Sequence, residues 1–341
     1  MSSAGGDWRP GASRAMLRQR AGLLARVREF FAARGVLEVD TPLIVNAPVS
    51  DVHIHSAMVQ LTPAAGAAAP RLFLHTSPEY AMKRLLAAGS GDIYQVCHVA
   101  RGLEQGRLHN PEFTLIEWYR IGLPLPELMS EVEALLRSLL AERAARLRSE
   151  RLSYGEAFRR ELGLDPFAAS RAQLLAAAQR AGYHAPARAP GEPDAAADDG
   201  QDERDELLQL LMAARVGPRL GRDALTFVHG YPASQAALAR LDPADPRTAQ
   251  RFELYVDGIE LANGFHELAS SAEQRARFQR DNDARRRRGL ALAPPDERLL
   301  AALAAGLPDC AGVALGFDRV LMLATGAGHI DEVLPFPTAR A

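Results

Sequence analysis

The stretch GRLHNPEFTLIEWYR, residues 106–120, decides the fold class that we expect for this chain of 341 residues. After Pro111 the side chains alternate between two faces. One face carries Phe113, Leu115, Glu117 and Tyr119, and the other carries Thr114, Ile116, Trp118 and Arg120. A period of two is typical of a β-strand, and most of these residue types favour strands. The first face combines a carboxylate and a phenol with apolar side chains, which neither a plain core face nor a plain solvent face would do.

The composition is that of an ordinary globular protein, with 48% hydrophobic and 24% charged residues. The net charge of -2 excludes an overall positive field that would attract nucleic acid, although a local basic patch stays open. The two cysteines, Cys97 and Cys310, give neither a disulfide framework nor a metal spacing, which fits a reducing compartment. The N-terminus lacks the apolar core of a signal peptide, and no run of 18 apolar residues exists. We therefore expect a cytoplasmic protein without a membrane partner.

The basic residues are strongly biased toward arginine. Of 40 lysines and arginines, Lys83 is the only lysine. A lysine retained under such a bias suggests a need for its compact ammonium group. Chance explains it equally well.

Hydrophobic periodicity divides the rest of the chain into helices and strands. Helices are predicted at 14–33, 125–160, 168–182 and 271–288. Strands are predicted at 36–45, 71–75, 92–101 and 225–234, with a hairpin at 252–268 and a strand, glycine turn and helix at 312–326. Because the strands do not alternate regularly with helices, we predict an α+β fold in which an antiparallel sheet is flanked by helices.

Two local signals support this division. Ser77, followed by Pro78 and Glu79, is a typical helix start with serine as N-cap and proline at the first helical position. Asp257-Gly258 between apolar runs is a strong hairpin signal.

The domain organisation follows from the same pass along the chain. We expect a flexible N-terminus over residues 1–13, a single domain over 14–341 and a mobile acidic insertion near 187–206. The chain has no P-loop and no G-x-G-x-x-G after a strand, so neither of these nucleotide-binding signatures applies.

Three acids interrupt otherwise apolar segments: Glu79, Glu117 and Glu267. An unpaired buried charge costs several kcal/mol, so a cationic ligand is a candidate for balancing them. Tyr119 lies two residues from Glu117 and shares its face. Several acids and one phenol suit a small substrate that carries two amines.

A second group suits a nucleotide. Arg101 ends a predicted strand and Arg319 opens a predicted helix, and arginine binds phosphate in a bidentate way. Glu253 and Glu260 lie on the two arms of the hairpin, where facing carboxylates hold Mg²⁺. Phe113 offers a ring for stacking a base, and Asn110 offers an amide for hydrogen bonding.

Each of these residues has a plainer explanation when it is taken alone. Glu117 would then lie on a solvent-exposed strand face, Arg319 on the surface and Phe113 in the core. A hairpin turn by itself says nothing about a metal. The functional interpretation gains weight because the residues occur together in one order.

That order resembles a known family. RGVLEVDTP (34–42), HNPEFTLIEWY (109–119) and GVALGFDR (312–319) resemble motifs 1, 2 and 3 of class II aminoacyl-tRNA synthetases, and the similarity extends from about residue 14 to residue 337. TSPEYAMKRLL (76–86) and GIELANGFHEL (258–268) are similar to the lysine-specific branch.

FVHGYPASQAALAR (227–240) and GLPDCAGVALG (306–316) resemble a shorter group, the elongation factor P (R)-β-lysine ligases. Lysyl-tRNA synthetases carry an N-terminal β-barrel that reads the anticodon, whereas this chain starts directly at the first expected catalytic helix. The resemblance therefore implies no tRNA partner.

The resemblance implies roles for individual residues. Substrate binding is implied for Ser77, Pro78, Glu79, Glu117, Tyr119, Glu267 and Ala314. ATP binding is implied for Arg101, Gly102, Leu103, Asn110, Phe113, Glu260, Leu261, Gly316 and Arg319. Arg101 and Arg319 would be catalytic, and Glu253 and Glu260 would hold Mg²⁺. Ala314 stands where tRNA-charging relatives usually have glycine, and its extra methyl group fits a β-amino substrate.

The chain departs from the family at one ATP contact. Gly102-Leu103 stand where the family normally has Asn-Glu, and that glutamate usually contacts adenine. Its loss weakens ATP selectivity unless Glu104 or backbone groups replace it. Ala100 also replaces a usual aromatic residue.

The implied activity is ATP-dependent activation of (R)-β-lysine, or of lysine, as the aminoacyl-adenylate, followed by transfer to a lysine of translation elongation factor P. Two alternatives stay open: a trimmed synthetase that charges tRNA or another acceptor, and a non-catalytic synthetase-like regulator. Class II cores usually pair through motif 1, so we expect a homodimer built around residues 14–45. Seven arginines between 275 and 288 indicate either a docking patch for the acceptor or a solvated helix face.

Overall fold

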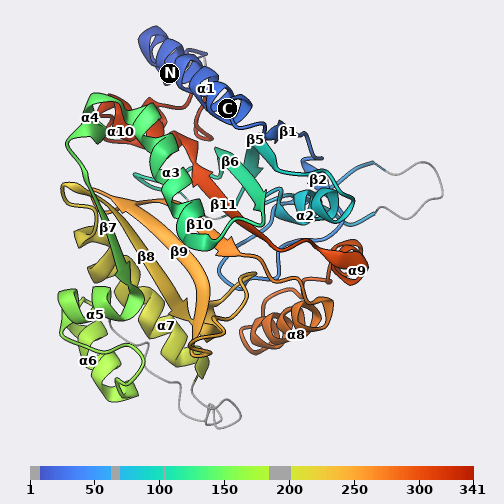
Figure 1. Ribbon diagram of the computed structural model, residues 1–341, viewed down its shortest axis with the longest axis vertical. Helices are drawn as coiled ribbons and strands as arrows, with labels where there is room; N and C mark the ends of the chain where they lie inside the picture. Colours follow the sequence, from blue (N-terminus) through green and yellow to red (C-terminus); the bar gives the residue numbers. More distant parts are fainter. Residues whose placement is uncertain (1–7, 63–69, 103–104, 184–200) are drawn as a thin grey trace, which may run out of the picture. The chain divides into compact units, whose positions relative to one another are not determined.

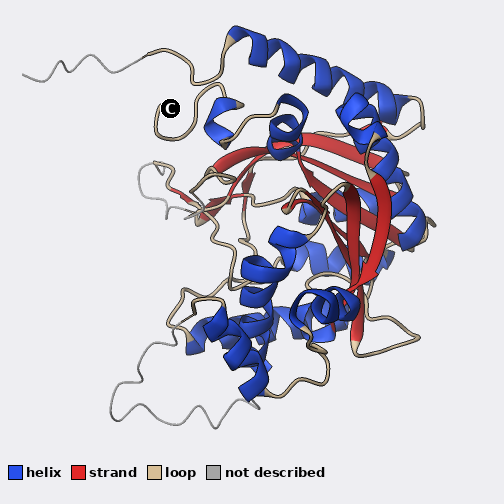
Figure 2. Ribbon diagram, turned by 90° about the vertical axis from the view of Figure 1, so that its left-hand side faces the viewer, coloured by secondary structure: helices blue, strands red, loops and turns tan. Residues whose placement is uncertain are grey.

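The computed structural model describes residues 8–62, 70–102, 105–183 and 201–341. The chain forms two compact units, Met1–Ala145 with Ala269–Ala341 and Arg146–Leu268. Each unit contains strands and helices, which Figure 2 distinguishes by colour. No helix among the described residues is both long and apolar enough to cross a membrane.

The first unit holds four strands of a mixed sheet and a separate small sheet (Figure 1). The order of the four is β1 (Leu37–Glu38), β5 (Ile93–Ala100), β6 (Glu112–Ile121) and β11 (Cys310–Gly316). β1 and β5 are parallel and the other neighbours are antiparallel. The small antiparallel sheet has the order β2 (Ile44–Val45), β4 (Leu72–Leu74) and β3 (Met58–Val59).

Helices of the first unit lie at both faces of β6. The helices are α1 (Arg14–Ala32), α2 (Glu79–Ala87), α3 (Leu125–Leu140), α4 (Glu142–Ala145), α8 (Ser271–Arg287), α9 (Glu297–Gly306) and α10 (Phe317–Thr325). On one face, the rings of Trp118 and Phe31 of α1 are 5.3 Å apart, and Trp118 Nε1 donates to Glu131 of α3 at 3.1 Å. On the other face, Tyr119 packs in a buried cluster with Met82 of α2 and Phe278 of α8.

The alternation after Pro111 is therefore confirmed as a strand with two different faces. Trp118 lies on the apolar face, which α1 and α3 cover. Glu117 and Tyr119 share the opposite face, because the Tyr119 hydroxyl donates to Glu117 at 2.6 Å.

The second unit has the strand order β10 (Ile259–His266), β9 (Thr248–Val256), β8 (Ala224–Pro232) and β7 (Arg148–Ser153), with β7 and β8 parallel. Its helices are α5 (Tyr154–Leu162), α6 (Arg171–Arg180) and α7 (Gln201–Leu211). Tyr154, Phe158, Leu211 and Val228 belong to its buried core.

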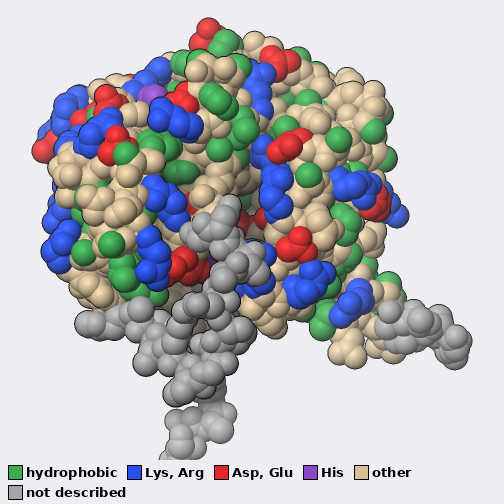
Figure 3. All heavy atoms as spheres, turned by 90° about the horizontal axis from the view of Figure 1, so that it is seen from below, with side chains coloured by type: hydrophobic (Ala, Val, Ile, Leu, Met, Phe, Trp, Pro, Cys, Tyr) green, Lys and Arg blue, Asp and Glu red, His purple; other side chains and the backbone are tan. Residues whose placement is uncertain are grey.

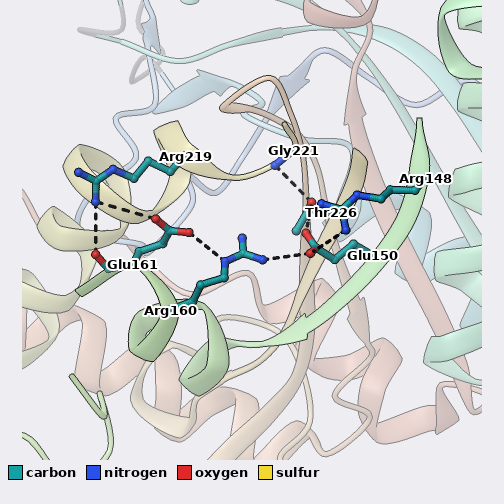
Figure 4. A network of polar contacts seen from close by, with 7 residues as sticks. All are labelled: Arg148, Glu150, Arg160, Glu161, Arg219, Gly221 and Thr226. Atoms are coloured by element: carbon teal, nitrogen blue, oxygen red, sulfur yellow. Dashed lines mark hydrogen bonds and ion pairs between the residues drawn. The ribbon is translucent and has the colours of Figure 1, made fainter. Parts of the chain in front are cut away.

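A network of ion pairs joins β7, α5 and β8 (Figure 4). Arg160 donates to Glu150 at 3.0 Å and to Glu161 at 2.9 Å, while Thr226 donates to Glu150 at 2.7 Å. Exposed pairs of this kind each contribute about 0–1 kcal/mol, so the network orients the elements more than it stabilises them.

The hairpin prediction is confirmed, and one helix prediction is wrong. β9 and β10 are joined by Asp257 and Gly258, which have φ of 49° and 74° as a primed turn requires. The predicted helix 125–160 instead ends at Leu140, and residues 148–153 form β7. Only one of the six residues of β7 is apolar, so hydrophobic periodicity could not reveal it.

Two further boundaries differ from expectation. The predicted strand 36–45 is divided into β1 and β2. The acidic insertion near 187–206 falls largely outside the described residues, but residues 201–206 open α7. Asp202 and Glu203 lie in its first turn, where carboxylates stabilise a helix. The helix α9 was not predicted.

Replacement of Gly258 by alanine is expected to destabilise the second unit by roughly 1–3 kcal/mol. A Cβ there would lie 2.6 Å from the Pro218 carbonyl oxygen, in addition to the strain of a positive φ. Gly230 is a matched control, since its φ is +68° but nothing lies within 4 Å of a Cβ. Urea denaturation should give a larger loss for Gly258→Ala than for Gly230→Ala, and equal losses would contradict the clash.

Candidate active site

The start of α2 and the centre of β6 bring five predicted substrate residues together. Ser77 Oγ donates to Glu117 Oε2 at 2.7 Å and accepts from the Glu79 backbone N–H at 3.0 Å. Tyr119 donates to Glu117 Oε1 at 2.6 Å. Pro78, and not Ser77, is the N-cap of α2, so the helix starts one residue later than predicted. The serine instead fastens the helix start to β6.

The sheet register adds one predicted residue and one unpredicted residue to this site. Ala314 of β11 and Gln95 of β5 both lie directly opposite Glu117. Directly opposite residues in antiparallel strands have Cβ atoms about 4.5–5.5 Å apart on one face. Ala314 is thus placed at the floor of the site beside Glu117. Gln95 is buried and accepts a hydrogen bond from Thr41 at 2.9 Å. The sequence signal that could have identified Gln95 is a single amide side chain within an otherwise apolar strand.

A cation of the chain itself balances Glu79, which we had expected a ligand to do. Lys83 Nζ donates to Glu79 Oε1 at 2.7 Å. The Lys83 side chain is 1% exposed and that of Glu79 is 14% exposed. Lys83 is the single lysine noted in the sequence, where its rarity was the only signal.

The surroundings of Glu117 change its acidity. Burial, followed by repulsion from Glu79, raises the pKa of Glu117 to about 7, although hydrogen bonds from Tyr119 and Ser77 and the charge of Lys83 act to lower this pKa. The carboxyl group is therefore poised between its two forms near neutral pH. A cation bound beside it would favour the ionised form.

This raised pKa predicts a pH dependence of stability. The folded protein holds a proton on Glu117 up to pH about 7, whereas the unfolded chain releases it near 4.5, so stability falls as pH rises between these values. Glu117→Gln should remove this fall. Denaturant titrations at pH 5 and pH 8 should show the variant gaining on the wild type at the higher pH. A difference between the two proteins that does not change with pH would contradict the assignment.

Arg101 and Phe113, predicted for phosphate and adenine, are neighbours. The Arg101 guanidinium lies 5.2 Å from the centre of the Phe113 ring. Its Nε donates to the Thr76 carbonyl at 3.3 Å, and Thr76 precedes Ser77 in the chain. Arg101, the candidate for phosphate binding, is therefore hydrogen-bonded to the turn that carries Ser77 and Glu79, which are candidates for amine binding.

Arg319 contacts the residues that precede the strand β6. Its Nε donates to the Leu108 carbonyl at 3.2 Å, and its guanidinium lies 2.6 Å from His109 Nε2. Gly316, the last residue of β11, is the N-cap of α10 and has no side chain to cap the helix. The guanidinium groups of Arg101 and Arg319, the Phe113 ring and the N-terminus of α10 are groups that suit a nucleoside triphosphate.

Other nucleotide candidates have structural contacts that the sequence did not predict. The Asn110 amide donates to the Glu112 carbonyl at 2.6 Å and accepts from the Thr338 N–H at 3.1 Å. The Gly102 N–H donates to the His55 carbonyl at 2.7 Å. Leu103 lies outside the described residues, as does Glu104, so their predicted roles stay predictions.

Asp318 was missed by the sequence analysis. It is buried, accepts from the Thr114 N–H at 2.6 Å and pairs with Arg20 of α1 at 2.5 Å. It thereby ties α1, β6 and α10 together behind the site.

The second unit carries the remaining predicted residues. Glu253 accepts hydrogen bonds from Arg251 at 2.5 Å, Tyr231 at 2.6 Å and Tyr255 at 2.5 Å. A carboxylate held by three donors fits poorly as a metal ligand. Among the described residues, no group of three or more His, Cys, Asp or Glu side chains is arranged to hold a metal ion.

Glu260 lies directly opposite Tyr255 and so shares a face with Glu253. Burial and then the charges of Glu253 and Glu260 raise the pKa of Tyr255. Leu261 is buried where the register shifts between Glu260 and Ala262, and Glu267 is buried at the end of β10. Glu260 is the better of the two metal candidates, because it is half-buried whereas Glu253 is buried.

Comparison with known proteins agrees with the architecture. A family model described as class II tRNA synthetases (D, K and N) matches residues 6–340. The protein named elongation factor P–(R)-β-lysine ligase from Vibrio cholerae is 50% identical over 335 residues, which cover 98% of this chain and 99% of that protein. A protein of the same name from Klebsiella pneumoniae subsp. pneumoniae is 48% identical over 334 residues, 98% of each chain. The chain therefore belongs to the class II tRNA synthetase family, and within it to the group of the elongation factor P–(R)-β-lysine ligases.

Proposed function

We propose that this chain activates (R)-β-lysine, or lysine, with ATP as the aminoacyl-adenylate and transfers it to a lysine side chain of translation elongation factor P, forming an amide. The names of its relatives support the reaction and its acceptor. The observation that carries the proposal is the hydrogen bond from Arg101 to the Thr76 carbonyl. It supports the proposal because the candidate phosphate-binding cation is held by the residue that directly precedes Ser77, in the turn that leads to Glu79.

The residues have separate tasks in the first step. The substrate carboxylate attacks the α-phosphorus of ATP, and pyrophosphate leaves. This carboxylate is ionised at neutral pH, so the protein needs no general base and contributes positioning and charge stabilisation. Arg101 stabilises the charge that develops on the α-phosphate, and Arg319 holds the leaving pyrophosphate. Glu117, Tyr119 and Glu79 orient the amines, and Phe113 stacks on adenine.

Mg²⁺ would supply further charge neutralisation on the phosphates, with Glu260 as its candidate protein ligand. We also infer a cytoplasmic location, since the acceptor named for the relatives is a translation factor, and a homodimer. Leu37, Leu43 and Ile44 are 55%, 43% and 43% exposed within the segment expected to pair, which supports the homodimer. Light scattering during gel filtration tests it.

The deciding experiment is mass spectrometry of elongation factor P after incubation with this protein, ATP and each lysine isomer. We expect a mass gain of one lysyl residue, largest with (R)-β-lysine. No gain with any isomer would refute the proposal. Charging of tRNA would favour the trimmed synthetase, and the absence of pyrophosphate exchange with either isomer would favour the regulator that the Gly102-Leu103 departure keeps open.

The arginines of α8 differ in their suitability for docking the acceptor. Arg285 is buried and donates to the carbonyls of Ala291 at 2.8 Å and Asp51 at 2.9 Å, so it holds the fold together. The sequence interpretation, in which the arginines between 275 and 288 form a docking patch, is therefore wrong at Arg285. Figure 3 shows basic and acidic side chains interspersed on one face of the molecule, which is the pattern of a solvated surface.

Charge reversal at the exposed residues 286–288 still tests docking. We expect slower transfer to elongation factor P, roughly tenfold at low salt, because charges at the rim of an interface mainly change association rates. Pyrophosphate exchange should be unchanged. Arg171→Glu on α6, which removes an exposed pair with Glu203, is the control. Equal loss of both steps would argue against docking.

A further inference from the structure

We propose that Arg20 sets the relative position of the Phe113 ring and the Arg319 guanidinium, the two ends of the proposed ATP site. It does so by joining their neighbours in the chain, Thr114 and Asp318. The inference rests on the proposed function, in which Phe113 stacks on adenine and Arg319 holds the phosphates. Arg20 acts through the two residues that it joins and is therefore a positioning residue.

Arg20, Thr114 and Asp318 close a ring of hydrogen bonds, which we call the Arg20 clamp. Arg20 of α1 donates from Nη1 to Asp318 Oδ1 at 2.5 Å and from Nη2 to Thr114 Oγ1 at 2.5 Å. The other carboxylate oxygen, Asp318 Oδ2, accepts from the Thr114 N–H at 2.6 Å. The Arg20 guanidinium also lies 5.1 Å from the centre of the buried Phe317 ring. A shift of α1, β6 or α10 relative to the other two would break at least one of these bonds.

The clamp lies where the pairing of β6 with β11 ends. The register of the two strands ends with Gly316 opposite Leu115. At the next position of β6, the Thr114 N–H donates to the Asp318 carboxylate in the first turn of α10. Asp318 therefore extends the connection between β6 and the β11 segment by one position, into the helix that carries Arg319.

The alternation of β6 separates the clamp from the adenine candidate. Phe113 and Thr114 are consecutive in the strand, so their side chains point to opposite faces. Arg319 directly follows Asp318 and donates to the Leu108 carbonyl at 3.2 Å. The clamp can therefore fix where Phe113 and Arg319 stand without occupying the face on which the Phe113 ring lies.

The chemistry of the clamp favours positioning over stabilisation. The side chains of Arg20 and Asp318 are 13% and 2% exposed. At such burial the cost of desolvation offsets much of the attraction between the two charges, so the pair adds little net stability. An arginine fork does fix the distance and the direction of two acceptors at once. Such rigidity suits a site whose groups have to be in place before charge develops on the phosphates.

Arg20→Met tests the inference, because it keeps the length of the side chain and removes the fork. We expect kcat/KM for ATP in pyrophosphate exchange to fall about 100-fold, the effect of a misplacement of about 1 Å. Adenosine needs only the Phe113 end of the site, and tripolyphosphate needs only the Arg319 end. The inhibition constants of both, measured in competition with ATP, should be unchanged, as should KM for lysine. A general loss of structure would not weaken the whole nucleotide while sparing its two parts.

Thr114→Val keeps the test decisive if Arg20→Met fails to fold, since it leaves no charge unpaired. It removes one acceptor of the fork, and we expect a loss of roughly tenfold in kcat/KM for ATP with the same pattern of inhibition. Thr114→Ser keeps the hydroxyl group and should restore the wild-type value. Arg143→Met is the control, because Arg143 of α4 donates to the Leu323 carbonyl of α10 at 2.7 Å without being part of the clamp.

Three results would overturn the inference while leaving the proposed function intact. These are tripolyphosphate binding that weakens as much as ATP binding, which would indicate a loss of charge balance, an equal loss in Arg143→Met, and a failure of Thr114→Ser to restore activity. A wild-type protein that does not bind ATP would overturn both the inference and the proposed function.

Discussion

Norleucine, which is lysine without its side-chain amine, is expected to be adenylated about 10⁴–10⁵-fold less efficiently than lysine. The reason is the burial of Glu117, which is 2% exposed and accepts hydrogen bonds from Tyr119 and Ser77. An ionised carboxylate in that position gains from the ammonium group of the substrate, which norleucine cannot supply, while Lys83 is engaged with Glu79. The rejection should therefore far exceed what the shape of the pocket alone would give.

Ornithine is the matched control for this experiment. It keeps both amines but lacks one methylene, so its loss should be only about 10–200-fold. The comparison belongs at pH 8, above the pKa of about 7 for Glu117, because a protonated carboxyl group would no longer need the amine. Pyrophosphate exchange measures all three substrates. Norleucine within the range of ornithine would contradict a buried amine-binding carboxylate.

Arg101→Ala is expected to lower the rate of adenylation by about 10²–10³, or roughly 3 kcal/mol of transition-state stabilisation. Arg101 is held over Phe113 and to the Thr76 carbonyl, so its charge is already in place before the phosphate charge develops. Arg101→Lys should recover only part of the rate, since an ammonium group lacks the bidentate geometry.

The control for Arg101→Ala is Arg275→Ala on α8. Arg275 forms an exposed pair with Glu297 at 2.7 Å, so its loss should leave pyrophosphate exchange unchanged. Denaturant titration of both variants separates lost activity from lost stability. The phosphate role of Arg101 would be untenable if both variants lost the same activity, or if only the transfer step slowed.

The sequence predicted those parts of the fold that depend on neighbouring residues. The strand after Pro111 was predictable because its alternation is local. The turn at Asp257-Gly258 was predictable because few residue types accept positive φ at two successive positions. β7 could not be found in this way, since its polar side chains carry no hydrophobic period and its parallel pairing with β8 joins distant parts of the chain.

The site was predicted as a set of residues but not as a set of contacts. The hydrogen bond from the Thr114 N–H to Asp318 joins residues 204 positions apart, a relation that no local pattern records. Glu253 is a different case, because Arg251 and Tyr255 flank it at a spacing of two and so share its face. That local pattern already indicated a carboxylate with its own donors, and it should have counted against Glu253 as a metal ligand.

The hydrogen bond from Arg101 to Thr76 has a consequence for inhibitor design. This bond joins the proposed subsites for the amino acid and for the phosphate. A stable mimic of the mixed anhydride, such as a sulfamate that links a diamine acid to adenosine, would engage both subsites without waiting for a loop to close. The affinity of this inhibitor would come from the preorganisation of the two subsites. Shortening its linker by one atom should remove most of this gain in affinity.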